Sequence, residues 1–280
     1  MFSSDIYAAR RETLVSRFEG GLLLFLGHGE APMNFVDNPY PFRQDSSFLY
    51  YFGLNQPDLT ALIDVDAGAT TIFGDELTLD HVVWMGDLPT LASRAEAVGV
   101  SDTRPGSDLA EILARAVASG RAVHFLPPYR AETKLQLLHL LGVAPEEAET
   151  EASSELIRAV VTQRNVKGPE EIQEIEKAVA TSVAMHEAAI GMARRGMMEL
   201  EISAEVERIA TAGGGGIAFP VIATINGQTL HNHYHGNTLS DGDLFLLDAG
   251  AQTFSGYAGD LTTTFPVAPR FSDRQRAVYG

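Results

Sequence analysis

The sequence predicts a two-domain protein in which an α/β domain is followed by a second domain of helices and strands. Two observations lead to this prediction. Short apolar runs alternate with helical patterns up to about residue 144, as is typical of α/β domains. The character then changes near residues 163–169, where Pro169, followed by Glu170 and Glu171, marks the start of a long helix. We place the boundary near residues 155–166, which gives domains of residues 1–160 and 161–280.

The elements of the first domain follow from local patterns. Apolar runs predict strands at residues 22–26, 61–65 and 123–126, and helical spacing predicts helices at residues 109–117 and 134–141. The aromatic run at residues 48–52 is predicted to be a further strand after a turn at residues 43–48, because aromatic residues favour strands.

The second domain should begin with the helix at Pro169, since apolar residues and one histidine then recur at helical spacing. These positions are Ile172, Ile175, Val179, Val183, His186 and Ile190. A second helix is expected near residues 202–210, followed by strands near 219–225, 244–247 and 262–267. The glycines at 213–216 lack a following Lys-Ser/Thr, so a Walker loop is rejected in favour of a flexible helix-to-strand connection.

Composition excludes several classes of protein. Hydrophobic residues make up 45% and charged residues 20% of the 280 residues, which is ordinary for a globular chain. The formal net charge of −17 argues against binding to nucleic acid or to an anionic membrane. The absence of cysteine excludes disulfides, zinc–thiolate sites and thiol nucleophiles. Because there is no run of 18 apolar residues, and because the N-terminus carries Asp5 rather than the basic head of a signal peptide, we expect a cytoplasmic protein.

Two aspartates are the most informative residues of the chain. Asp248 ends the apolar run at residues 244–247, and Asp260 comes just before the β-branched run at residues 262–264. A hairpin between these runs would place the two carboxylates side by side. Adjacent carboxylates repel unless they share a proton or a cation, and hard divalent ions favour oxygen ligands. The alternative is that both are surface aspartates in turns.

Three histidines, His231, His233 and His235, alternate along the chain before this region. In an extended strand they would face the same way and could bind zinc. The alternative, which we favour, is a loop with one functional histidine and two exposed neighbours.

Motifs in both halves resemble those of the Xaa-Pro aminopeptidase/prolidase family, the aminopeptidase P type of metallopeptidase family M24. Residues 41–53 (PFRQDSSFLYYFG) resemble the signature of its N-terminal domain, and residues 167–172 (KGPEEI) resemble the entry into its catalytic domain. Residues 241–250 and 257–266 are similar to its metal-binding hairpin. The resemblance implies a creatinase/aminopeptidase P N-terminal α/β domain followed by an α+β pita-bread catalytic domain, incomplete at the C-terminus.

The resemblance also implies the site and the reaction. Asp248 and Asp260 match two ligands of a dinuclear centre that holds two divalent metal ions, for which manganese fits the oxygen-rich ligands. His231 matches the histidine that contacts substrate and the tetrahedral intermediate, with His235 as a second substrate contact, although His233-Tyr234 offers a competing alignment. The implied activity is hydrolysis of the bond before proline in dipeptides or at the N-terminus of peptides, by a homodimer.

Two departures from the family pattern stand out. Thr263 occupies a position where many relatives carry arginine, and residues 1–280 contain no match to the family's remaining His, Glu and Glu ligands. We expect a fragment of a longer protein, inactive by itself and without a tightly held dinuclear centre; the alternative is loss of the second half of the site. Other readings are an inactive pita-bread protein that binds peptides or proteins, and a metal-independent hydrolase of the creatinase type, which generally lacks the aspartate pair.

Overall fold

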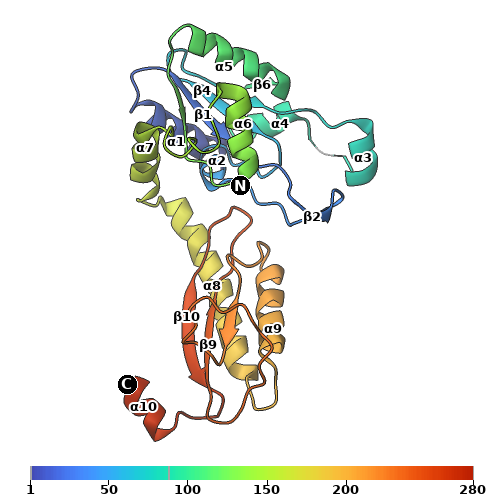
Figure 1. Ribbon diagram of the computed structural model, residues 1–280, viewed down its shortest axis with the longest axis vertical. Helices are drawn as coiled ribbons and strands as arrows, with labels where there is room; N and C mark the ends of the chain where they lie inside the picture. Colours follow the sequence, from blue (N-terminus) through green and yellow to red (C-terminus); the bar gives the residue numbers. More distant parts are fainter. Residues whose placement is uncertain (1, 88, 280) are drawn as a thin grey trace. The chain divides into compact units, whose positions relative to one another are not determined.

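The computed structural model describes residues 2–87 and 89–279. The chain divides into two compact units, residues 1–166 and 167–280 (Figure 1). Helix α7 (Ser154–Arg164) therefore lies in the first unit, and helix α8 (Pro169–Met192) begins the second. In the part of the chain that the structure describes, no helix is both long and apolar enough to cross a membrane.

A five-stranded mixed sheet forms the centre of the first unit, in the order β6-β5-β4-β1-β7. Its strands are β1 (Leu22–Leu26), β4 (Thr60–Asp64), β5 (Ala69–Phe73), β6 (Asp102–Arg104) and β7 (Val123–Phe125). Strand β1 runs antiparallel to β4 and parallel to β7, while β5 runs antiparallel to β4 and parallel to β6. The three strands expected from apolar runs are confirmed as β1, β4 and β7.

Helices cover both faces of this sheet. Alternate residues of β1 enter different hydrophobic clusters: Leu23 and Phe25 face one, and Leu22 and Leu24 face the other. The helices are α1 (Ser4–Val15), α2 (Ser46–Phe52), α3 (Leu79–Met85), α4 (Leu91–Glu96), α5 (Leu109–Ala118), α6 (Ala131–Leu141) and α7, with a 3₁₀ turn at Gly106–Asp108. The helices expected near 109–117 and 134–141 are confirmed as α5 and α6. Strands β2 (Pro32–Phe35) and β3 (Asn38–Pro39) form a separate small hairpin.

The prediction of a strand at residues 48–52 was wrong, because these residues form helix α2. The Asp45 carboxylate accepts hydrogen bonds from the N–H groups of Ser47 and Phe48 at 2.8 and 2.9 Å, so it caps the helix N-terminus. Gly53 ends the helix in a left-handed conformation, with φ of 64°. Phe48 and Phe52, four residues apart, are fully buried. Caps and core packing therefore outweigh the preference of aromatic residues for strands.

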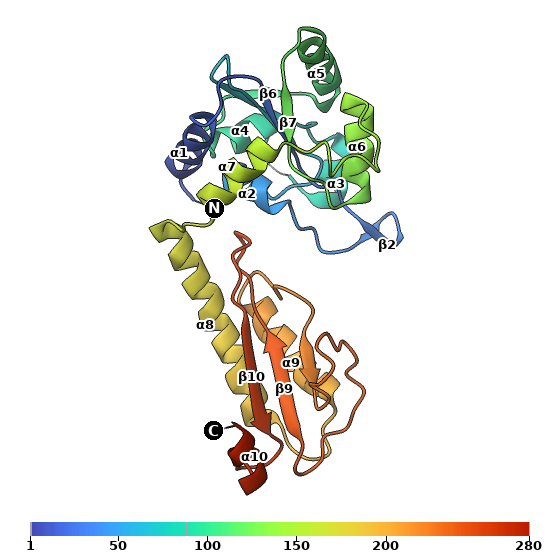
Figure 2. The same ribbon diagram turned by 60° about the vertical axis from the view of Figure 1, so that its left-hand side comes forward.

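The second unit contains a three-stranded antiparallel sheet in the order β10-β9-β8. Its strands are β8 (Ile222–Thr224), β9 (Leu244–Ala249) and β10 (Leu261–Pro266), and its helices are α8, α9 (Glu199–Ala212) and α10 (Asp273–Tyr279). Helices α8 and α9 lie together on one face of the sheet (Figure 2). The strands and helices expected from the sequence are confirmed here, as is the glycine-rich connection from α9 towards β8.

The buried face of α8 differs from the apolar face that the sequence predicts. His186 is buried, but Ile172, Val183 and Ile190 are 42–49% exposed. The residues that face the interior include Ala178, Ser182, Met185 and Ala189. Small side chains occupy this face because, as described below, a hairpin backbone approaches the helix there.

Candidate functional site

A regular hairpin places Asp248 and Asp260 on one face of the second sheet. Strands β9 and β10 keep a single register, in which Thr262 lies opposite Asp248. The same register continues beyond the strands to the bridge between Gln252 and Ala258, so Asp260 lies opposite Gly250. Since side chains alternate along a strand, the two carboxylates are diagonal neighbours on the same face.

The opposite face of this hairpin packs on the helices. Phe245, Leu247, Ala249 and Phe265 are buried in the core of the second unit, and the Thr263 side chain contacts α8. Asp248 and Asp260 therefore face away from α8 and α9.

Two glycines allow the hairpin backbone to pack closely, one across the hairpin and the other against helix α8. A Cβ on Gly250 would overlap the carbonyl oxygen of Gly259 across the hairpin. A Cβ on Gly259 would lie 2.6 Å from Ser182 Oγ and 2.9 Å from the Val179 nitrogen on α8. Each glycine lies within two residues of an aspartate, so the backbone is closely packed next to both carboxylates.

The carboxylates suit a divalent cation. Asp248 Oδ1 is buried and accepts no hydrogen bond from any described residue, and a buried polar oxygen is costly to leave without a partner. Asp260 is exposed. Carboxylate oxygens are the ligands that hard divalent ions prefer. Within residues 2–87 and 89–279, no group of three or more His, Asp or Glu residues could hold a metal, so this pair could contribute two ligands to a site but does not form a metal site by itself.

Helix α8 supports the hairpin through two polar side chains. His186 Nε2 lies 3.1 Å from the Ala249 carbonyl oxygen, which can only accept, so this nitrogen carries the proton. In the neutral ring Nδ1 then accepts from the Thr263 hydroxyl at 2.8 Å. The Ser182 hydroxyl accepts from the N–H of Ala251 at 2.9 Å. These bonds fix both strands on either side of the carboxylates.

The three histidines lie in a loop and not in an extended strand. Residues 231–237 have no regular secondary structure, and His231 and His233 are exposed. His235 Nε2 donates to the Val221 carbonyl oxygen at 3.1 Å. The three imidazoles do not form a metal group among the described residues, so the zinc alternative lacks support.

Comparisons with known proteins agree with this architecture. Residues 7–124 match the model of the aminopeptidase P N-terminal domain, and residues 173–280 match that of metallopeptidase family M24. The chain belongs to the aminopeptidase P/prolidase family. The expected fold class, an aminopeptidase P-type N-terminal domain followed by an M24 domain, is thereby confirmed.

Individual relatives match nearly the whole chain. The Xaa-Pro aminopeptidase of Escherichia coli is 26% identical over 99% of this chain and 65% of its own length. The human Xaa-Pro dipeptidase is 26% identical over 98% of this chain and 58% of its own length. This chain therefore spans about three-fifths of the length of these two relatives.

Solved structures show the same fold. Pseudomonas aeruginosa aminopeptidase PepP has a TM-score of 0.85 at 26% identity, covering 99% of this chain and 65% of that one. Zinc-substituted E. coli aminopeptidase P in complex with product has a TM-score of 0.83 at 26% identity, covering 99% of this chain and 66% of that one.

Two features of this family member were not found from the sequence. The sequence identifies His186 only as one position in a helical pattern, yet it joins α8 to Thr263, the residue noted above as a departure from the family pattern. The buried Glu199 was not singled out at all. Its sequence neighbour Glu201 occupies the same first helical turn, and no spacing distinguishes the two.

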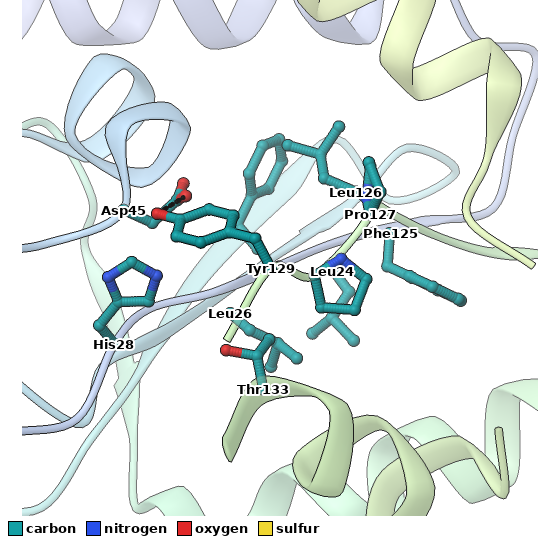
Figure 3. A pocket seen from close by; sticks show the side chains of 11 residues that line it. Leu24, Leu26, His28, Asp45, Phe125, Leu126, Pro127, Tyr129 and Thr133 are labelled. Carbon is teal, nitrogen blue, oxygen red and sulfur yellow. Dashed lines mark hydrogen bonds between the residues drawn. The ribbon is translucent and has the colours of Figure 1, made fainter. Parts of the chain in front are cut away.

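The first unit contains a pocket of its own, at the carboxyl ends of the parallel strands β1 and β7 (Figure 3). His28, Asp45, Tyr129 and Thr133 supply its polar side chains. They are held within the domain: His28 Nδ1 lies 3.1 Å from the Arg43 carbonyl oxygen, and the Tyr129 hydroxyl donates to Asp45 at 3.3 Å.

Proposed function

We propose that the whole protein is a metal-dependent peptidase that hydrolyses the bond between an N-terminal residue and a following proline. The observation that carries the proposal is the Asp248/Asp260 pair on the open face of the sheet, with one buried carboxylate oxygen left without a hydrogen-bond partner. The names of the relatives, an Xaa-Pro aminopeptidase and an Xaa-Pro dipeptidase, support the choice of peptide bond.

Asp248 and Asp260 would hold part of a dinuclear centre, for which we propose manganese. Bound divalent ions supply an activated water and Lewis-acid polarisation of a carbonyl at neutral pH. The open face of the hairpin leaves Asp260 accessible, while the bonds of His186 and Ser182 keep the strands beneath it fixed. Rigid placement matters because catalytic groups lose activity steeply when they are displaced.

We propose that His231 hydrogen-bonds the oxygen that gains negative charge during the reaction, with His235 as a further substrate contact. Donors aimed at a developing charge are among the largest contributions to catalysis. The exposure of His231 leaves its ring available to a ligand. His233 remains the competing candidate. The bond before proline needs a specialised peptidase, because its tertiary amide has no N–H and peptidases that require that donor fail on it.

The test uses the whole protein, as its gene encodes it, with an Xaa-Pro dipeptide, an Xaa-Pro tripeptide and an Xaa-Ala control. Asp260→Asn removes a ligand charge, so we expect kcat/KM on the proline substrates to fall by at least about 100-fold with the fold intact. The matched control is Asp241→Asn, an exposed aspartate paired with Arg195 at 3.2 Å, which should retain activity. Full activity of the Asp260→Asn protein, or in excess chelator, would refute the metal proposal.

For the 280-residue chain alone we propose weak divalent binding and no turnover of Xaa-Pro peptides. Two carboxylates leave most of a metal's coordination to water, and hard-cation sites gain affinity from ligand number and rigidity. Metal analysis after dialysis, on a chain whose mass has been verified, should find no stoichiometric manganese. Two retained equivalents of manganese, or proline-specific turnover, would overturn this proposal.

We also propose that the protein forms at least a homodimer through its N-terminal domain. Helix α3 has no buried residue, and its apolar side chains Leu79, Val83, Trp84 and Met85 are each at least 70% exposed. The β2–β3 hairpin, which lies on the same side of the first unit as α3, exposes Phe35. Exposed apolar patches of this kind mark interaction surfaces. A monomer mass that does not depend on concentration in sedimentation would count against the dimer.

The cytoplasmic location remains a prediction from the sequence.

A further inference from the structure

Glu199, the first residue of α9, is a fully buried carboxylate with four hydrogen-bond donors. Its Oε1 accepts from the Thr224 hydroxyl at 2.9 Å and from the N–H of Ile225 at 2.8 Å. Its Oε2 accepts from the N–H of Asn237 at 3.2 Å and from the Asn237 side-chain amide at 2.9 Å. One side chain thus holds both ends of the loop that carries the three histidines.

The hydrogen bonds continue into the middle of this loop. Thr224 Oγ1, which donates to Glu199, accepts from the N–H of Asn226 at 3.0 Å and from the Asn232 side-chain amide at 3.2 Å. The Asn232 side-chain oxygen in turn accepts from the N–H of Tyr234 at 3.0 Å. Asn232 directly follows His231 in the sequence, so the network reaches the immediate neighbour of the candidate catalytic residue.

A carboxylate suits this position because all four groups around it are donors. An ionised carboxylate only accepts, whereas the amide of glutamine would direct its NH₂ group at two of these donors. No lysine, arginine or histidine of the described chain forms an ion pair with Glu199. The buried charge is balanced by the four donors and by the positive end of the 14-residue helix α9.

Within this network, Thr224 lies on the face of the sheet that carries the metal-ligand candidates. In β8, Ile222 lies opposite Asp248 and Thr224 lies opposite Leu246. By strand alternation, Thr224 and Asp248 therefore face the same side.

We propose that Glu199 is a positioning residue, whose buried carboxylate fixes the loop at residues 225–237 and thereby sets the position of His231 beside the carboxylate face. The role of His231 rests on the proposed function, but the effect of Glu199 on the loop does not. Because four donors converge on one side chain, loss of the carboxylate should release both ends of the loop together.

The first experiment measures the loop directly in the 280-residue chain. Glu199→Gln should raise hydrogen exchange of the Ile225 and Asn237 amides by about ten-fold or more, and should shift the imidazole NMR signals of His231 and His233. The signals of His81 and His124 in the first unit should stay in place. The matched control is Glu201→Gln, because among the described residues the Glu201 side chain accepts only from the N–H of Met198, at 2.8 Å and within the same helix turn. Unchanged loop exchange in Glu199→Gln, or equal changes in both variants, would overturn the proposal.

A second pair of variants covers the case in which Glu199→Gln does not fold. Thr224→Val keeps the shape of the side chain but breaks the link from Glu199 to Asn232, and Thr224→Ser restores the hydroxyl. We expect the first to release residues 226–234 and the second to rescue their protection. The proposal fails if both variants behave alike.

Turnover by the whole protein separates this inference from the proposed function. A displaced His231 should lower kcat by about 10- to 100-fold with a smaller change in KM, in Glu199→Gln but not in Glu201→Gln. Loop release with unchanged kcat would remove His231 from the reaction and leave the positioning role of Glu199 standing.

Discussion

The two units of this chain use a β-sheet in different ways. In the first unit both faces of a five-stranded sheet are packed, with Leu23 and Leu24 entering opposite hydrophobic clusters. In the second unit the helices α8 and α9 pack on one face, and the other face carries Asp248 and Asp260. A sheet packed on both sides has no free face for chemistry. The half-covered sheet packs on helices on one side and carries the partly buried Asp248 and the exposed Asp260 on the other.

The strand sequences reflect this difference. Strand β1 is a run of Leu and Phe, whose first four residues are buried, as expected for a strand covered on both sides. Strand β9 alternates buried and more exposed residues up to Asp248 and Ala249. The period of two therefore separates the buried positions that pack on the helices from the position of Asp248 within one short strand.

The largest loss of stability is expected at Gly250, where the backbone of the second unit leaves no room for a side chain. Gly250→Ala would place a methyl group on the Gly259 carbonyl oxygen, so we expect the second unit to lose at least about 3 kcal/mol of unfolding free energy. Hydrogen exchange resolved by peptide should show this loss in residues 167–279 and leave the first unit protected. The control is Gly191→Ala in α8, where a Cβ meets nothing within 4 Å. This substitution should increase the unfolding free energy by about 0.5–1 kcal/mol. Equal tolerance of both changes would contradict the close approach.

The next test compares the two faces of each sheet by urea unfolding. Leu23→Ala and Leu24→Ala lie on opposite faces of β1, and each should cost about 3 kcal/mol because both residues are buried. In the second unit, Leu247→Ala should cost a similar amount, whereas Thr262→Val on the open face should change stability by less than about 0.5 kcal/mol. A large cost for Thr262→Val would mean that the open face is packed after all.

A smaller loss of stability is expected at the N-terminal cap of α2, the helix formed by the aromatic run. Asp45→Ala removes the acceptor for two N–H groups of α2 and should destabilise the first unit by about 1 kcal/mol. Asp45→Asn should retain most of the stability, since asparagine caps nearly as well. Thermal unfolding of the three proteins provides the measurement. If Asp45→Ala were neutral, packing alone would be holding the helix.

An effect of similar size at neutral pH, which decreases in acid, concerns Arg121 in the first unit. Partial burial tends to raise the pKa of Asp64, but hydrogen bonds from Arg121 and the Ala67 N–H outweigh it and hold this pKa below its usual value. A lowered folded-state pKa stabilises above the unfolded pKa of about 4, and this stabilisation disappears as the pH falls through the folded pKa.

Arg121→Met should therefore cost about 1 kcal/mol at pH 7 and progressively less below pH of about 4, measured by urea unfolding across this range. The control is Arg115→Met, whose pair with Glu111 at 3.5 Å is exposed and should contribute less than about 0.5 kcal/mol. A difference between Arg121→Met and the native protein that stays constant with pH would rule out Asp64 as its source.

The sequence by itself determined the elements of the second unit from α8 to β10, part of the elements of the first unit and the location of the aspartate pair. Apolar runs predicted β1, β4, β7 and β9, and Pro169 predicted the start of α8, because these patterns express local preferences and burial of one strand face. The hairpin between Asp248 and Asp260 followed from two strands joined by a short connection. These features depend on residues close together in the chain.

Only the tertiary structure decided the remainder. The aromatic run became α2 because Asp45 caps it and a core accepts Phe48 and Phe52 four residues apart. The buried face of α8 carries small residues because the Gly259 backbone packs against it. Glu199 and Glu201 look alike in the sequence, and only the return of Asn237 to the start of α9 makes the first a buried anchor of the histidine loop. Each depends on contacts between distant residues, which local preference does not encode.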